Sequence, residues 1–69
     1  MSEGKLGNHL RPARGQRGLT QAELALMVQV SRKTINTIEN GVFIPSTYLA
    51  LKLAQALNMR VEELFFIPD

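Results

Sequence analysis

A stretch in the middle of the chain carries polar side chains that could hydrogen-bond to a nucleic acid. If residues 31–39 form a helix, four of these side chains share one face at the spacing i, i+1, i+4 and i+5, namely Arg32, Lys33, Asn36 and Thr37. An α-helix fits the major groove of B-DNA, where Arg and Lys suit guanine O6 and N7, Asn suits adenine N6 and N7, and the Thr methyl suits the methyl of thymine. The pattern therefore predicts a face that contacts base edges.

The alternative is that this face is an ordinary solvated helix surface. Such surfaces usually mix acidic with basic side chains, whereas no acid occurs between Glu23 and Glu39. The two halves of the chain also differ in charge. Residues 1–33 carry six cations and two acids, and residues 34–69 carry two cations and four acids. The N-terminal half is therefore the part suited to a polyanion.

The sequence offers little for catalysis or for binding a metal ion. His9 is the single histidine and cysteine is absent, so a metal site would need carboxylates alone. Thr20, Ser31 and Ser46 lie where helices are expected to begin, and capping explains them without a nucleophilic role. We expect no enzymatic activity, no catalytic residue, no metal and no cofactor.

Five short helices are expected to position the polar face. Capping residues, glycines and the spacing of apolar residues predict them at about residues 9–17, 20–28, 31–39, 46–57 and 61–66. No segment of useful length alternates with period two, so the predicted fold class is all-α. The connection between the second and third helices is too short for antiparallel packing, so these helices must cross steeply, as in a helix-turn-helix.

The size of the chain makes its stability marginal. With 69 residues it forms one domain, and a domain of this size buries only about 60% of its unfolded surface. Disulfides are excluded, which leaves oligomerisation as the common way to add stability. No stretch approaches the roughly 18 apolar residues of a membrane span, and the N-terminus lacks the apolar core of a signal peptide. A cytoplasmic protein without a membrane partner is expected.

Several motifs resemble the Cro/cI-type (XRE) helix-turn-helix family. They are Gly18-Leu19-Thr20-Gln21-Ala22-Glu23-Leu24-Ala25, Val30-Ser31-Arg32-Lys33-Thr34-Ile35, Ile38-Glu39-Asn40-Gly41, Pro45-Ser46 and Leu49-Ala50-Leu51-Lys52-Leu53-Ala54. The resemblance covers residues 10–65, and the ending Glu62-Glu63-Leu64-Phe65 is similar to that of small stand-alone, cytolysin-repressor-like members. It implies a five-helix lambda-repressor-like domain over residues 8–66, a lead-in or short strand at 1–7, short terminal β-strands and a tail at 67–69.

The resemblance also implies roles for individual residues. The predicted polar face matches the base-reading face of the family. Positions that match contacts to the phosphate backbone are Gln21, Ser31 and Asn40, together with the amides around Phe43 and Ile44. Gln21 also matches a residue that can brace the recognition helix. Arg14 and Glu39 match a structural ion pair that holds this helix in place.

Three features depart from the family pattern. Gln29 occupies a turn position where Gly or Asn is usual, and a left-handed backbone there would cost roughly 1 kcal/mol. Pro12 and Gly15 weaken the first helix. Arg60 stands where an N-cap residue commonly begins the fifth helix. These departures affect stability and helix boundaries rather than the predicted DNA-reading face.

The apolar C-terminal segment predicts a two-fold interface with a second copy of the chain, formed by Val61, Leu64, Phe65, Phe66 and Ile67. The open alternative is that this segment covers the core of its own monomer. A homodimer would place two recognition helices about 34 Å apart on a pseudo-palindromic operator. We expect a nucleoid-associated repressor of transcription that binds a specific sequence in double-stranded DNA. The alternative is a protein-interaction module, such as an antitoxin that binds an unidentified partner, on the same scaffold.

Overall fold

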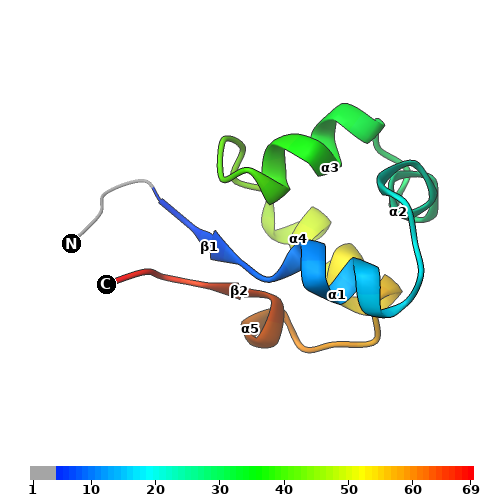
Figure 1. The fold of residues 1–69 in the computed structure, drawn as a ribbon. Coiled ribbons are helices and arrows are strands. Elements are labelled where there is room, and N and C mark those ends of the chain that lie inside the picture. The colour runs from blue at the N-terminus through cyan, green and yellow to red at the C-terminus, as the bar shows by residue number, and fades with distance from the viewer. Residues whose placement is uncertain (1–4) are drawn as a thin grey trace.

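Five helices and a two-stranded sheet follow one another along the chain. In this computed structural model, which describes residues 5–69, the elements are β1 (Gly7–Asn8), α1 (Leu10–Gln16), α2 (Gln21–Val28), α3 (Arg32–Glu39), α4 (Thr47–Ala56), α5 (Val61–Leu64) and β2 (Phe65–Phe66). The predicted five-helix fold with terminal strands is confirmed. Residues 1–4 of the predicted lead-in lie outside the described residues. Figure 1 shows α3 along one edge of the molecule, α5 at the opposite edge, and the two terminal strands side by side at one end.

Short polar side chains begin three of the helices. Thr20, a predicted cap, forms a capping box with Glu23 at the start of α2. The Thr20 hydroxyl accepts from the Glu23 amide at 3.0 Å, and the Glu23 carboxylate accepts from the Thr20 amide at 2.8 Å. The hydroxyls of Ser31 and Ser46 cap α3 and α4 in the same way. Each of these bonds satisfies an amide that a helix start would otherwise leave unpaired.

Left-handed residues other than glycine follow two helices and redirect the chain. Gln29 follows α2 with a φ of 63°, and Asn58 follows α4 with a φ of 54°. The left-handed turn at Gln29 was predicted. Gln29 lacks the conformational freedom of glycine, so this conformation costs roughly 1 kcal/mol. In return, the Val30 amide donates to the Ala25 carbonyl at 3.0 Å, and the chain enters α3 after a tight turn.

Apolar side chains from all five helices fill one core. The largest fully buried members are Leu10, Leu24, Val28, Ile35, Ile38, Leu53, Leu57 and Leu64. Ala25 is also buried and lies on α2, the helix that packs most extensively on α3. A small side chain there lets the two helices approach closely. The helix-turn-helix packs against α1 and α4, and α5 in turn packs on α4.

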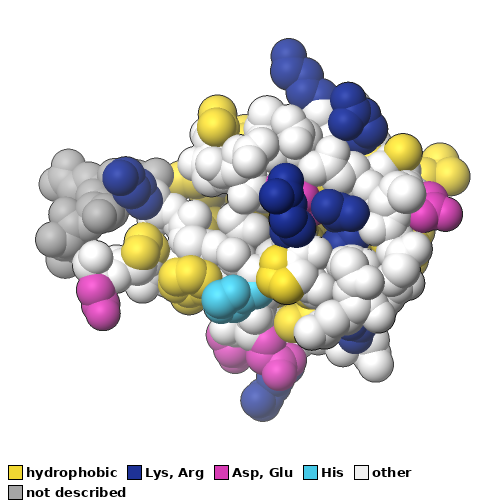
Figure 2. Space-filling view, in the orientation of Figure 1, with side chains coloured by type: hydrophobic (Ala, Val, Ile, Leu, Met, Phe, Trp, Pro, Cys, Tyr) yellow, Lys and Arg dark blue, Asp and Glu magenta, His cyan; other side chains and the backbone are white. Residues whose placement is uncertain are grey.

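The charged side chains are unevenly distributed over the surface. On the face shown in Figure 2, Lys and Arg gather over α1 and α3, whereas Asp and Glu gather on the lower edge over α5. Among residues 5–69, no helix is long and apolar enough to cross a membrane. The cationic side of the molecule is thus the side that carries the helix-turn-helix.

The end of the chain differs from its prediction. Residues 61–66 were expected to form one helix, but α5 stops at Leu64 and the chain then extends into β2. Leu64 is 0% exposed and Phe65 is 7% exposed, so both fill the core of their own monomer. The predicted dimer interface is wrong for these two residues, because their side chains are not available to a second copy. Phe66 and Ile67 remain on the surface, with 40% and 78% exposure.

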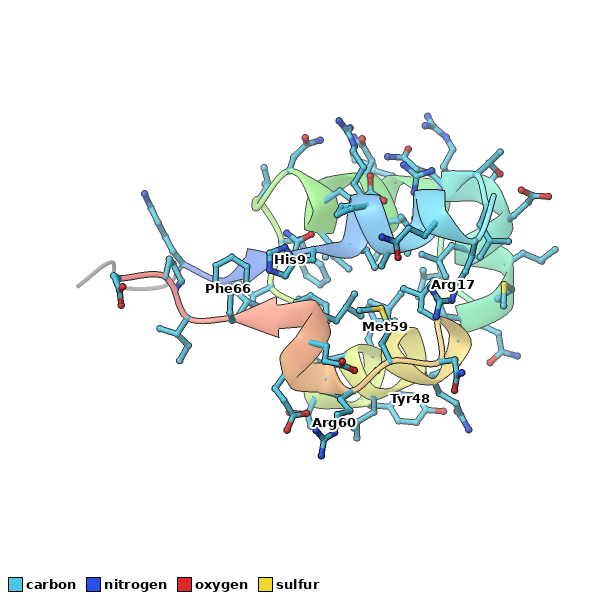
Figure 3. All side chains as sticks on the ribbon, turned by 60° about the horizontal axis from the view of Figure 1, so that its bottom comes forward. His9, Arg17, Tyr48, Met59, Arg60 and Phe66 are labelled. Atoms are coloured by element: carbon cyan, nitrogen blue, oxygen red, sulfur yellow. The ribbon has the colours of Figure 1, made fainter. Side chains whose placement is uncertain are left out.

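A glycine opposite a phenylalanine shapes the terminal sheet. β1 and β2 are antiparallel, with Gly7 opposite Phe66 and Asn8 opposite Phe65. The Phe66 ring stacks on the His9 ring with a centroid separation of 4.7 Å, and the two rings lie side by side in Figure 3. A Cβ at residue 7 would lie 2.2 Å from Phe66 Cε2. The Phe66 ring therefore occupies space that only glycine leaves open.

We predict that Gly7→Ala destabilises the protein by about 1 kcal/mol, because the new methyl forces the Phe66 ring off His9 and into solvent. Gly15→Ala is the matched control. It lies within α1 with no atom within 4 Å of the new Cβ, and it should stabilise by about 0.5–1 kcal/mol. Urea unfolding of both variants measures the difference. Equal free energies of unfolding would contradict this account of the sheet.

Candidate nucleic-acid interface

The polar face of α3 is partly open to solvent. Ile35 and Ile38 turn into the core, while Arg32 and Lys33 are exposed and Asn36 and Thr37 are half-buried. The four predicted base-contacting residues thus lie on a helix whose opposite face is fixed by packing. A side chain that reads a base must be held in position by its surroundings, so the contacts of this face decide what it can do.

The carboxylate of Glu39, at the end of α3, is the centre of these contacts. Arg14 donates to it twice, from Nε to Oε2 at 2.7 Å and from Nη2 to Oε1 at 3.2 Å. Arg11 Nε lies 3.4 Å from Oε1, and Gln21 Nε2 donates to the same oxygen at 3.0 Å. The Glu39 side chain is 0% exposed. α1 and α2 are therefore both tied to the end of α3 through one buried carboxylate.

The ion pair with Arg14 keeps this carboxylate charged. Burial raises the pKa of Glu39, but the hydrogen bonds from Arg14, Gln21 and Arg11 and the charge of Arg14 outweigh it, so the pKa lies below the ordinary value for a glutamate. The hydrogen bond to Glu39 in turn raises the pKa of Arg14. The Arg14 side chain is 16% exposed, and its Nη1 also donates to the Leu19 carbonyl at 2.9 Å. The structure thus contains the ion pair that the resemblance implied.

Gln21 connects the buried carboxylate to the polar face. Its Nε2 donates to Glu39 and also to Asn36 Oδ1 at 3.2 Å, and its Oε1 accepts from Arg32 Nη1 at 3.2 Å. Both hydrogens of the side-chain amide are therefore used within the protein. A phosphate contact from this amide would have to break one of these bonds. The side chain of Gln21 is placed to brace α3, which was the second role that the resemblance implied for it.

The other predicted contact residues lie around the two ends of α3. Ser31 caps the N-terminus, and Asn40 follows the C-terminus, where its Nδ2 donates to Asn36 Oδ1 at 3.3 Å. Thr37 Oγ1 donates to the Thr34 carbonyl at 3.0 Å. The Phe43 amide donates to the Thr37 carbonyl at 3.2 Å. A phosphate contact from the Phe43 amide would have to break or share this bond, so the contact from the amides around Phe43 and Ile44 stays a prediction.

Two residues at this site were not predicted from the sequence. Asn8 joins β1 to α3, since its Nδ2 donates to the Ile38 carbonyl at 3.0 Å while its Oδ1 accepts from the Leu10 amide at 3.0 Å. Asparagine is a strong capping residue, so Asn8 could have been noticed as a signal for the start of α1. From the sequence, Arg11 is only one of the six cations of residues 1–33. No local signal reveals its approach to Glu39.

We predict that Arg14→Ala destabilises the protein by about 3 kcal/mol, because it leaves a buried carboxylate without its main partner. Arg11→Ala is the matched control: it removes an arginine from the same carboxylate, but this side chain is 67% exposed and its loss should cost less than about 1 kcal/mol. Urea unfolding of the two variants gives the comparison. Equal losses would show that Arg14 is not the principal partner of Glu39.

The lowered pKa of Glu39 also predicts how stability depends on pH. Its contribution is complete above the pKa of an unfolded glutamate, about 4.3, and is lost as the pH falls through the lower pKa of the folded state. Glu39→Gln should therefore reduce the stability near neutral pH and make the acid decline shallower. Some decline should remain, because the bonds to Thr20 also lower the pKa of Glu23. Urea titrations between pH 3 and pH 7 would contradict this if wild type and variant lost stability in parallel.

Comparison with known proteins places this geometry in a family. Residues 10–64 match the model of a helix-turn-helix family. An HTH-type transcriptional regulator of Archaeoglobus fulgidus is 45% identical over 60 residues, which cover 87% of this chain and 86% of that protein. The HTH-type transcriptional regulator YgzD of Bacillus subtilis is 36% identical over 62 residues, which cover 90% of this chain and 94% of that protein.

A solved structure agrees with the sequence comparison. The restriction-modification controller protein C.AhdI from Aeromonas hydrophila superimposes with a TM-score of 0.74 at 35% identity, and the match covers 78% of this chain and 82% of that protein. The match of the family model spans most of the chain and includes α2, the turn and α3. The chain belongs to the XRE-type helix-turn-helix family and is a DNA-binding regulator of transcription.

Proposed function

We propose that this protein is a repressor that binds a specific sequence in double-stranded DNA with α3 in the major groove. The observation that carries the proposal is the polar face of α3, where Arg32 and Lys33 expose nitrogen donors to solvent. Hydrogen bonds from α1 and α2 to the buried carboxylate of Glu39 hold this helix in position. Major-groove edges of base pairs display patterns of acceptors and donors that such a face can distinguish. Occlusion of a promoter by the bound protein is the simplest effect on transcription.

The contacts divide into two groups with different consequences. Arg32, Lys33, Asn36 and Thr37 read bases. Ser31, Asn40 and the amide of Ile44 contact phosphates. These contacts fix the position of the protein along the duplex and do not depend on the base sequence. Gln21 positions its neighbours on α3. We expect this function to need no cofactor, and a protein bound to the chromosome would lie with the nucleoid in the cytoplasm.

The protein acts as a homodimer on a pseudo-palindromic operator. Support comes from the exposed apolar side chains of Phe66 and Ile67 at the terminal sheet, next to the half-buried Val61. This sheet lies at one end of the molecule, whose longest extent is 34 Å. In a homodimer joined at this end, the two α3 helices would have to lie one turn of DNA apart, about 34 Å, to reach both half-sites.

Selection of bound duplexes from a random pool tests the proposal. We expect enrichment of two inverted half-sites about 10 base pairs apart. Lys33→Ala should then weaken binding to the enriched sequence by about 1–3 kcal/mol. Lys52→Ala removes a lysine of α4 that bonds to Gln29 and lies over the Tyr48 ring, and it should leave affinity almost unchanged. Enrichment of no sequence would overturn the proposal, and a single half-site would overturn the homodimer.

A further inference from the structure

Hydrogen bonds connect the side chains of Glu39, Gln21 and Arg32 in a row. The charged groups at the two ends of this row fix which way the amide of Gln21 points. Glu39 is ionised, so its carboxylate can only accept, and Arg32 can only donate. Gln21 lies between them, and its Nε2 must therefore face Glu39 while its Oε1 faces Arg32, as the distances of 3.0 Å and 3.2 Å indicate. The second hydrogen on Nε2 points to Asn36 at 3.2 Å. The atom of Asn36 that receives it must be the oxygen.

Asn36 is left with donors and no free acceptor. Its Oδ1 accepts from Gln21 and also from Asn40 Nδ2 at 3.3 Å, which uses both lone pairs of the oxygen. Its Nδ2 carries two hydrogens and has no hydrogen-bond partner among residues 5–69. The usual pairing of Asn with adenine needs one acceptor for N6 and one donor for N7. Asn36 cannot make this pairing without releasing Gln21 or Asn40.

We propose that Asn36 reads a G·C base pair, by donating to O6 and N7 of guanine, and that Gln21 and Asn40 are the positioning residues that determine this choice. Guanine presents two adjacent acceptors in the major groove, whereas the edge of adenine places a donor beside its acceptor. A donor-only amide therefore leaves the N6 amino group of adenine unpaired. This inference rests on the proposed binding of α3 in the major groove, and it replaces the expectation that Asn36 prefers adenine.

The test is duplex selection with four proteins. Wild type and Asn36→Ala identify the base pair that Asn36 reads, since only that position should lose its preference in the variant. We expect a G·C pair there. The double variant Gln21→Ala/Asn40→Ala frees Oδ1, so its preference at the same position should shift toward A·T by about tenfold. Gln55→Ala, which removes an exposed glutamine of α4, should keep the preference of wild type.

A second measurement avoids any effect of substitution on folding. Replacing the contacted guanine by 7-deazaguanine removes the N7 acceptor and should weaken binding of wild type by about fivefold, while binding of Asn36→Ala should not change. These results would support the proposal. Equal weakening of wild type and Asn36→Ala would overturn it, because Asn36 would then not be the group that contacts N7.

The remaining outcomes of the selection separate this inference from the proposed function. An A·T pair at the position that Asn36 reads would overturn the inference and leave sequence-specific binding intact. The same holds if no position depends on Asn36, or if the double variant keeps a full G·C preference. If no protein enriches any sequence, both the inference and the proposed function fail.

Discussion

The buried carboxylate of Glu39 is the constraint on which the arrangement of the helix-turn-helix depends. A carboxylate that is removed from water must be paired and hydrogen-bonded, and here the donors come from α1 and α2. The end of α3 is therefore fixed relative to two other helices by directional bonds as well as by apolar packing. Replacing such a cluster by apolar residues can preserve stability, but it would remove the group that orients Gln21.

Positioning and recognition are linked through the same bonds. Gln21 donates one hydrogen of its side-chain amide to the buried carboxylate and the other to Oδ1 of Asn36. A change at Glu39 would therefore alter the polar face of α3, on which we propose that DNA binds, although the carboxylate is 0% exposed. The residues that hold α3 in position, Glu39 and Gln21, therefore also determine which atoms of Asn36 are left to donate or accept hydrogen bonds.

Much of the fold could be predicted because its signals are local. Thr20, Ser31 and Ser46 mark helix starts by capping chemistry, and the short connection between α2 and α3 requires a steep crossing. The end of the chain could not be predicted in this way. Whether Phe65 continues a helix or forms a strand depends on Asn8, at the other end of the chain, with which it pairs. Phe65 is buried within that pairing, whereas Leu64 is buried as the last residue of α5.

The candidate site was predictable in its residue types and not in its hydrogen bonds. The spacing of Arg32, Lys33 and Asn36 places them on one face, and the resemblance implied the pair of Arg14 and Glu39. The convergence of Arg11 and Gln21 on the same carboxylate depends on how α1 and α2 cross α3, which the sequence does not state. Whether Asn36 has a free donor or a free acceptor could therefore be decided only from the position of Gln21 in the structure.

The most direct measurement of the central claim is an NMR titration of the Gln21 side-chain amide, carried out over the acidic range in which the protein stays folded. If an ionised Glu39 orients Gln21, the signals of this amide should move with a midpoint below the ordinary pKa of a glutamate, and Glu39→Gln should abolish the movement. Signals that do not respond to pH, or that respond equally in Glu39→Gln, would contradict the account.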